Sequence, residues 1–143
     1  MPDPATPNPV AQRVLGYHFL ADTGLLRDGR TPPPDGEWLE HDGPLVMCER
    51  GLHLSERAID ALHYAPGALV CRVEAGGKIV RDSDKLVCSR RRILWRADAT
   101  APLWAFARAQ ALGMIHLWDA TEVVRRYLET GDKSLRAAAE AAA

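Results

Sequence analysis

Hydrophobic and aromatic residues occur along the chain in short runs separated by glycine, proline and small polar residues. Apolar runs of this length, bounded by turn residues, are typical of β-strands. They predict strands at 14–20, 44–48, 68–74, 78–80, 85–88 and 91–95, and the last two are either separate strands or one bulged strand.

The segment 69–74 shows the clearest alternation, because its odd-numbered residues are apolar whereas Arg72 and Glu74 are charged. Successive side chains of a strand point to opposite faces, so one face of this strand is expected to be buried and the other exposed. Gly76 and Gly77 are expected to end it.

Two helices are indicated by their terminal residues. Ser55 stands where an N-cap residue would begin a helix over 56–64. Pro102 suits the first turn of a second helix that ends at Gly113.

Two further helices are expected in the C-terminal part. Asp119 is followed three residues later by a glutamate, which is the spacing of a capping box, and Gly131 is expected to end the helix that follows. Asp132 is expected to cap a last, alanine-rich segment in which Leu135 is the obvious apolar anchor.

These elements predict an α+β protein with a small, twisted, mixed or antiparallel sheet, the short helix after Ser55 and C-terminal helices. Proline and small polar residues predict a disordered or extended arm at 1–12, and glycine and proline leave little room for regular structure in the loop 21–43. The expected organisation is a single domain at 13–131 followed by an alanine-rich helix at 132–143.

Composition narrows the function classes. The formal net charge of −1 over 143 residues gives no strong nucleic-acid signal, and any contact with nucleic acid would have to be local. The sequence shows neither a signal peptide nor an apolar run long enough to span a membrane, so a cytoplasmic protein is expected. Three cysteines at wide spacing indicate reduced thiols and predict no metal site.

The residues Cys48-Glu49-Arg50-Gly51-Leu52-His53-Leu54-Ser55, here called the cassette, carry a resemblance. With the helix that ends at Tyr64 and the strand that follows, the cassette resembles an uncharacterised domain family of phage and prophage proteins. The recurring pattern of that family is C-E-x-G-[FL]-H-[FL], and the resemblance covers roughly residues 14–96.

A more distant likeness concerns chemistry. The cassette from Gly51 to Ser55, followed by a helix and the segment 67–75, resembles the middle of the ADP-ribosyltransferase fold. That fold includes poly-ADP-ribose polymerases and RNA 2′-phosphotransferases. The resemblance implies that His18 and His53 are catalytic, that Tyr64 helps to bind the cofactor, and that NAD or ADP-ribose is the ligand.

Arg90, Arg91 and Arg92 stand in the region where poly-ADP-ribose polymerases carry a glutamate, whereas RNA 2′-phosphotransferases use Arg and His there. The arginines therefore favour phosphate binding over glycohydrolysis. If they lie in a strand, one guanidinium must face opposite to its neighbours. The alternatives are a solvated strand edge for the arginines, and for His53 an imidazole that is hydrogen-bonded to the backbone.

Two hypotheses lead. The first is a non-enzymatic phage-type binding or assembly module that binds a protein partner, or its own copy, through the C-terminal alanine-rich helix. The second is an NAD- or ADP-ribose-binding enzyme that uses His18, His53 and the arginines. A nucleic-acid-binding protein is a further alternative.

Overall fold

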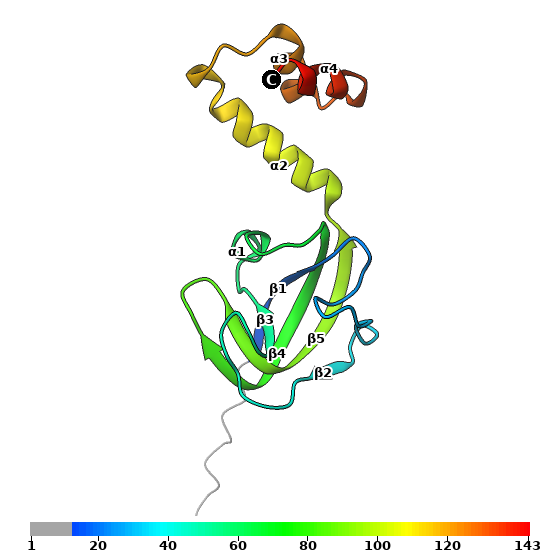
Figure 1. Cartoon of the computed structure of the whole chain (residues 1–143), viewed down its shortest axis with the longest axis vertical. Coiled ribbons are helices and arrows are strands. Elements are labelled where there is room, and N and C mark those ends of the chain that lie inside the picture. The colour runs from blue at the N-terminus through cyan, green and yellow to red at the C-terminus, as the bar shows by residue number, and fades with distance from the viewer. Residues whose placement is uncertain (1–12) are drawn as a thin grey trace, which may run out of the picture. The chain divides into compact units, whose positions relative to one another are not determined.

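A computed structural model describes residues 13–143 of the chain, and the arm expected at 1–12 lies outside them. The described chain divides into two compact units, one that ends at Asp98 and one that spans Ala99–Ala143. Strands dominate the first unit and helices form the second, so the predicted α+β class is confirmed (Figure 1).

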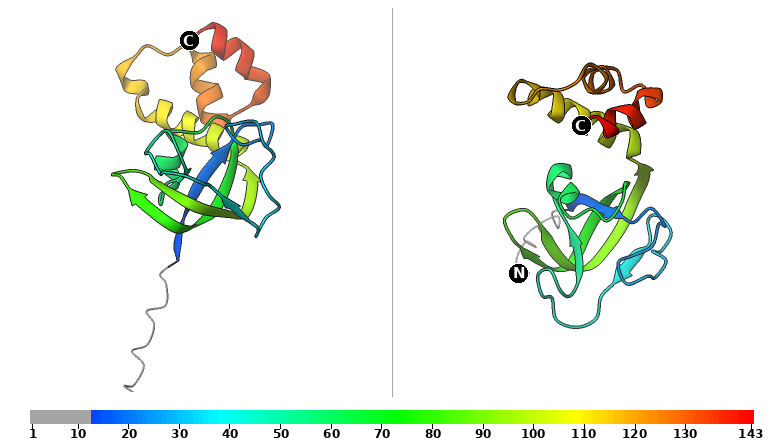
Figure 2. Two further views of the ribbon diagram at one scale, coloured as in Figure 1. Left: turned by 60° about the horizontal axis from the view of Figure 1, so that its bottom comes forward. Right: turned by 45° about the horizontal axis from the view of Figure 1, so that its top comes forward.

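The N-terminal unit is an open five-stranded antiparallel sheet in the order β1-β4-β5-β2, with β3 also paired to β5. β4 and β5 are the longest strands and curve together as one hairpin (Figure 2). The strands are β1 Val14–Leu20, β2 Trp38–Glu40, β3 Leu52–Leu54, β4 Leu69–Arg81 and β5 Leu86–Asp98.

The prediction that Gly76 and Gly77 end a strand is wrong, because β4 continues through them to Arg81. The register with β5 shifts between Gly76 and Ile79, which marks a bulge rather than a turn. Gly77 has φ +68, and a Cβ there would collide with the Ser89 side chain. The segment 86–98 is correspondingly one strand.

The core lies on the inner face of the curved sheet. Cys71 and Val73 of β4 contribute to it, as the alternation in 69–74 predicts. The expectation that Glu74 lies on an exposed face is wrong, because this residue is only 7% exposed. The buried apolar residues of this cluster are Leu20, Leu26, Leu54, Cys71, Val73, Ala75, Leu86, Cys88 and Ile93.

Ser55 links the end of β3 back to β1 instead of capping a helix. The Ser55 N–H donates to the Tyr17 carbonyl at 3.0 Å, and the Tyr17 N–H donates to the Ser55 carbonyl at 2.7 Å. The helix α1 (Ala58–Leu62) therefore begins later than predicted, with Arg57 at its N-cap position and no side-chain cap.

Two other predictions for this unit are wrong. The strand expected at 44–48 is a tight turn closed by a bridge between Val46 and Arg50. Part of the loop 21–43 forms the short strand β2, whose regular structure comes from its pairing with β5.

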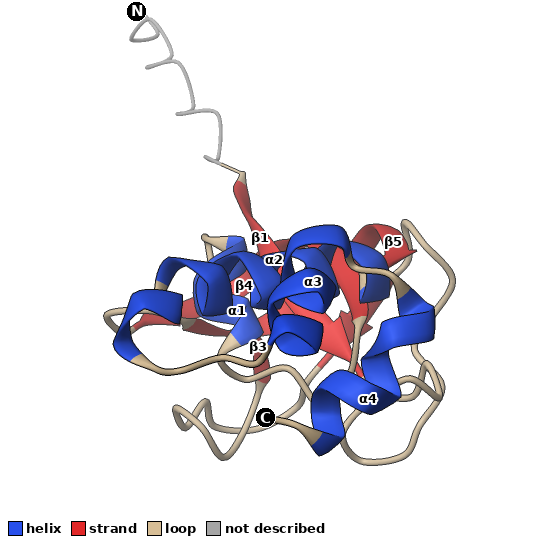
Figure 3. Ribbon diagram, turned by 90° about the horizontal axis from the view of Figure 1, so that it is seen from above, coloured by secondary structure: helices blue, strands red, loops and turns tan. Residues whose placement is uncertain are grey.

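The C-terminal unit consists of short helices (Figure 3). Gly131 ends α3 in a left-handed conformation and Asp132 caps the next turn through the Ser134 N–H, as predicted. Asp119 does not cap α3, because Thr121 occupies the N-cap position. The bounds are α2 Thr100–Gly113, η1 Ile115–Leu117, α3 Glu122–Thr130, η2 Lys133–Leu135 and α4 Arg136–Ala141.

The alanine-rich tail forms η2 and α4, which contact α3. Ala139 of α4 is buried within this unit. None of the helices in residues 13–143 combines the length and the apolar character needed to cross a membrane.

We predict that Gly51→Ala strongly destabilises the N-terminal unit. Gly51 has φ +116, and a Cβ there would meet the Val87 side chain and lie 2.8 Å from Leu45 Cδ2. Strain and overpacking together should lower the free energy of unfolding by about 3 kcal/mol or more.

Urea denaturation followed by circular dichroism measures this change. Gly29→Ala is the matched control, because Gly29 also has a positive φ (+83) but has open space around it. The control should cost about 1 kcal/mol. Equal losses in the two variants would show that close packing at Gly51 is unimportant.

Candidate functional site

The structure brings together three of the six residues predicted for a site. Arg91 points to the inner side of the sheet, is only 4% exposed and donates a hydrogen bond to the His53 backbone carbonyl. His18 lies close enough to Arg91 and His53 for their charges to act on it. His18, His53 and Arg91 form what we call the inner cluster.

Electrostatics in the inner cluster disfavour protonated histidine. The pKa of His18 lies well below its ordinary value. The larger cause is burial, which removes solvent from the imidazole, and the second is the positive charge of Arg91. The same two causes lower the pKa of His53, against the effect of a hydrogen bond with the Gly51 backbone. Both histidines are therefore neutral at physiological pH, next to a permanently charged guanidinium.

The imidazole of His53 holds the cassette in shape. Its Nε2 accepts a hydrogen bond from the Cys48 N–H at 2.9 Å, and Cys48 has φ +67, which is unusual for a residue other than glycine. One ring nitrogen of His53 is thus occupied by the turn that precedes β3. This contact corresponds to the backbone-bound alternative considered for His53 in the sequence.

Arg90 and Arg92 lie on the outer face of the sheet, opposite to Arg91, as the alternation within a strand predicts. Their guanidinium carbons lie 4.5 Å and 4.7 Å from the ring centroid of Trp38 in β2. Arg90 also pairs with Glu40 at 2.9 Å. The arginine run is therefore divided between the two faces of the sheet.

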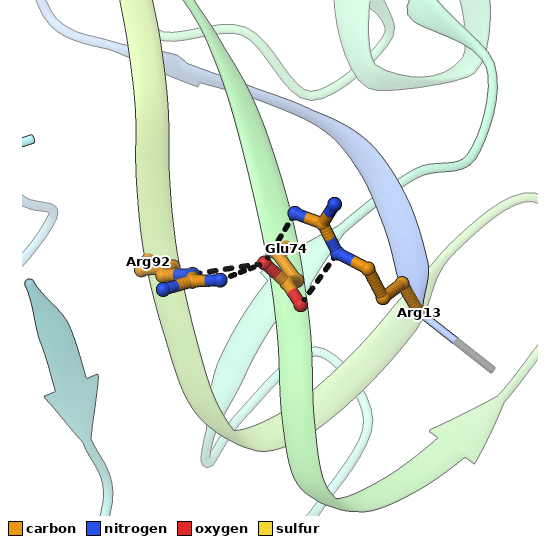
Figure 4. Close-up of polar contacts among 3 residues, drawn as sticks. All are labelled: Arg13, Glu74 and Arg92. Carbon is orange, nitrogen blue, oxygen red and sulfur yellow. Dashed lines mark hydrogen bonds and ion pairs between the residues drawn. The ribbon is translucent and has the colours of Figure 1, made fainter. Parts of the chain in front are cut away.

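Glu74 joins Arg92 to the start of the described chain (Figure 4). Arg13 donates to both carboxylate oxygens of Glu74, at 3.1 Å and 3.0 Å, and Arg92 donates to Oε2 at 2.8 Å. Glu74 is 7% exposed, and these bonds, with that from Arg13 the largest cause, lower its pKa although burial opposes the shift. Glu74 therefore remains ionised and fixes both guanidinium groups.

A neighbouring row of the same face carries Tyr17, Arg72 and Trp95. Arg72 pairs with Tyr17 in β1 and with Trp95 in β5, so the three side chains lie on one face. The Arg72 guanidinium carbon lies 4.5 Å from the Tyr17 ring centroid, and Trp95 is 47% exposed. No carboxylate pairs with Arg72 within residues 13–143.

We call this outer surface the arginine–aromatic face. Sequence reasoning identified only two of its members, Arg90 and Arg92, as site residues. The alternation of charged and apolar residues around Arg72 and Glu74 indicated that these two side chains share a face of the sheet. It does not reveal which strands pair with theirs, so the aromatic members of the face could not be identified. The members are Arg13, Tyr17, Trp38, Glu40, Arg72, Glu74, Arg90, Arg92 and Trp95.

Tyr64, which the resemblance assigned to the cofactor, makes its contacts with Asp84 and Lys85 and not with the inner cluster directly. Its hydroxyl donates to Asp84 at 2.6 Å, and Lys85 lies 4.3 Å from its ring centroid. A groove of about 100 Å³ runs beside Asp84 and Lys85, and a cavity of about 10 Å³ lies next to Arg91. Neither hollow is lined by His18 or His53.

The described residues contain no group of three or more His, Cys, Asp or Glu side chains suited to hold a metal ion. The structure therefore offers two arrangements of charged side chains for functional interpretation. One is the half-buried inner cluster, and the other is the accessible arginine–aromatic face.

Residues 30–104 match a family model described as a domain of unknown function (DUF7666). The match covers just over half of the chain. The chain belongs to this family. The match includes β2, the cassette, β4 and β5, and therefore most of the arginine–aromatic face. No curated protein and no solved structure matches the chain.

We predict that acid destabilises the protein through His18. Because the folded-state pKa is lowered, the unfolded chain binds a proton that folded His18 does not. Stability should be highest above pH 6.5, the ordinary value for histidine. Below it, stability should fall by up to roughly 1.4 kcal/mol per pH unit for this group.

Urea denaturation between pH 7 and about pH 5 measures the slope. His18→Gln should make the slope shallower, whereas His116→Gln, at an exposed position in η1, should leave it unchanged. An unchanged slope in His18→Gln would contradict the assignment.

Proposed function

We propose that the protein is a non-enzymatic binding module whose arginine–aromatic face binds single-stranded nucleic acid. The observation that carries the proposal is the exposed ring of Trp95 in one row with Arg72 and Tyr17. Bases of single strands stack on aromatic rings and on guanidinium planes, and arginine also binds phosphate. One face therefore combines both kinds of contact.

The charge of the face supports the proposal. Its four arginines and two glutamates leave a local charge of +2, on a chain whose formal net charge is −1. Attraction for a polyanion is thus concentrated on one surface. The stacked guanidinium groups are held in place by Glu74 and Trp38, which lowers the entropy cost of binding.

Single strands fit this face better than duplex. Aromatic rings on a sheet need unpaired bases with free ring faces, whereas the bases of a duplex stack on each other. The enzyme hypothesis has weaker geometric support, because one His53 ring nitrogen is occupied by Cys48 and Arg91 is buried.

We predict that Trp95→Ala lowers the affinity for labelled oligo(dT) and oligo(U), measured by fluorescence anisotropy with the full chain. Loss of one stacking contact should weaken binding by about one to two orders of magnitude. Trp118→Ala is the matched control, because Trp118 is 41% exposed but belongs to the C-terminal unit. Equal affinities of both variants and the native protein would exclude this face.

The salt dependence provides a second measure from the same titrations. Binding should weaken between about 50 and 200 mM salt, and Arg72→Gln should make the slope of log K against log [salt] shallower by about 0.7. Glu40→Gln should increase the affinity, because it removes a negative charge from the face. No binding of either oligonucleotide at low salt would refute the proposed function.

A second candidate function, assembly, is favoured by the helical unit. Helix α2 has no buried residue, and the unit exposes five large apolar side chains. Apolar surface gathered in so short a segment is typical of interaction sites. The exposed side chains are Trp104, Phe106, Met114, Leu117 and Trp118.

We propose a second copy of this chain as the partner for this surface. Arg108 is the one charged residue of α2, and its guanidinium lies against Gly131 at the end of α3. Arg136 of α4 adds a second cation beside α2, because its guanidinium carbon lies 3.5 Å from the Trp104 ring centroid. Two copies of α2 can avoid like-charge repulsion by meeting away from this ring, where the alanines of the helix allow a close approach. The proposed interface is thus on α2, whereas the sequence suggested self-association through the alanine-rich tail.

We predict that the native protein is dimeric by light scattering and that Leu117→Glu makes it monomeric, because a buried charge disrupts an apolar interface. Leu117 is 64% exposed, so the fold should tolerate the change. Val80→Glu, at a position that is 46% exposed in β4, is the control and should stay dimeric. A monomeric native protein at high concentration would contradict this candidate.

A further inference from the structure

Cys48 and Lys85 bring a thiol and an amine into contact away from the arginine–aromatic face. Cys48 lies in the turn before β3, and Lys85 lies in the turn between β4 and β5. The distance between Cys48 Sγ and Lys85 Nζ is 2.6 Å. Two reactive side chains that are 37 residues apart in the sequence are thus held side by side.

The backbone of Cys48 and the side chain of Lys85 are both held by their surroundings. The Cys48 N–H donates to His53 Nε2, and the turn that carries Cys48 is closed by hydrogen bonds between Val46 and Arg50. The Lys85 ammonium lies over the ring of Tyr64, whose hydroxyl is bound to Asp84. A reaction between Cys48 and Lys85 would therefore need little rearrangement.

Cys48 is also the most accessible thiol of the chain. It is exposed, whereas Cys71 and Cys88 are buried. Burial raises the pKa of both buried thiols, which disfavours their reactive thiolate forms. An oxidant in the solvent therefore reaches Cys48 first, at a sulfur that already contacts a cation.

We propose that Cys48 and Lys85 form a reversible sulfur–nitrogen cross-link when the protein meets a peroxide. Hydrogen peroxide first oxidises the thiol to a sulfenic acid and is itself reduced to water. The ammonium of Lys85 first gives one proton to the solvent, and the lone pair of the resulting amine attacks the sulfur. The S–O bond breaks, and the hydroxyl takes a second proton from this nitrogen and leaves as water, so that one amine hydrogen remains on the nitrogen of the S–N bond.

The cross-link joins the turn before β3 to the β4–β5 turn. It also protects Cys48 from further, irreversible oxidation, because the sulfenic acid is consumed. A small thiol restores both side chains: two thiol molecules become a disulfide, while Cys48 and Lys85 regain their hydrogens. The pair thus acts as a redox-modification site.

Mass spectrometry of the full chain after hydrogen peroxide treatment tests the proposal. The expected product is a tryptic species that joins peptides 31–50 and 82–90 and is lighter by two hydrogen atoms than their sum. Peptide 82–90 contains Lys85 uncleaved, because trypsin does not cleave after a blocked lysine. Dithiothreitol should remove the cross-link. Protein unfolded in guanidinium before the peroxide should give none, because the contact between the two side chains is lost.

Lys85→Arg separates the two chemical steps. Arginine keeps the positive charge but is a poor nucleophile, so the sulfenic acid should accumulate and its labelling by dimedone should rise several-fold over the native protein. Cys48→Ser should give neither product. The proposal would be overturned if native and Lys85→Arg protein were labelled equally by dimedone and the native protein gave no cross-linked peptide. A cross-link one oxygen atom heavier, or no reaction at Cys48, would also overturn it.

Discussion

The pairing of β4 with β5 is the constraint on which the rest of the N-terminal unit depends. Both strands have 13 residues, and each of the remaining strands β1, β2 and β3 pairs with one of them. Two register shifts along this pair increase its curvature. Because the strands curve, the residues of one face converge to form the core while those of the other face spread over a broad surface.

The alternation of side chains along β5 divides the arginine run between these two faces and thus between two chemical environments. Arg91 points inward, loses its solvent and contacts the His53 backbone, whereas Arg90 and Arg92 point outward and stack on Trp38. The sequence predicted the alternation correctly. It could not predict that Trp38 would lie beside the arginines, since β2 takes its place from its pairing with β5.

Elements specified by local chemistry were predictable from the sequence. The strand at 14–20 and the left-handed Gly131 follow from short-range patterns, and both are confirmed. Predictions failed where a distant partner decides the structure. Ser55 is an N-cap residue by type, but its backbone pairs with Tyr17, and Gly76-Gly77 has the composition of a turn yet forms a bulge against β5.

The bridge between Tyr17 and Ser55 has a consequence for solubility. In the sheet, β1 pairs with β4, β4 with β5, and β5 with β3. The bridge joins the residue after β3 to β1, so the backbone groups of Tyr17 and Ser55 are paired within the chain. Unpaired strand edges are templates on which other chains add strands and aggregate. The sheet stays open, but the paired groups of Tyr17 and Ser55 are no longer such a template, which allows the outer face to carry exposed aromatic rings with less risk of aggregation.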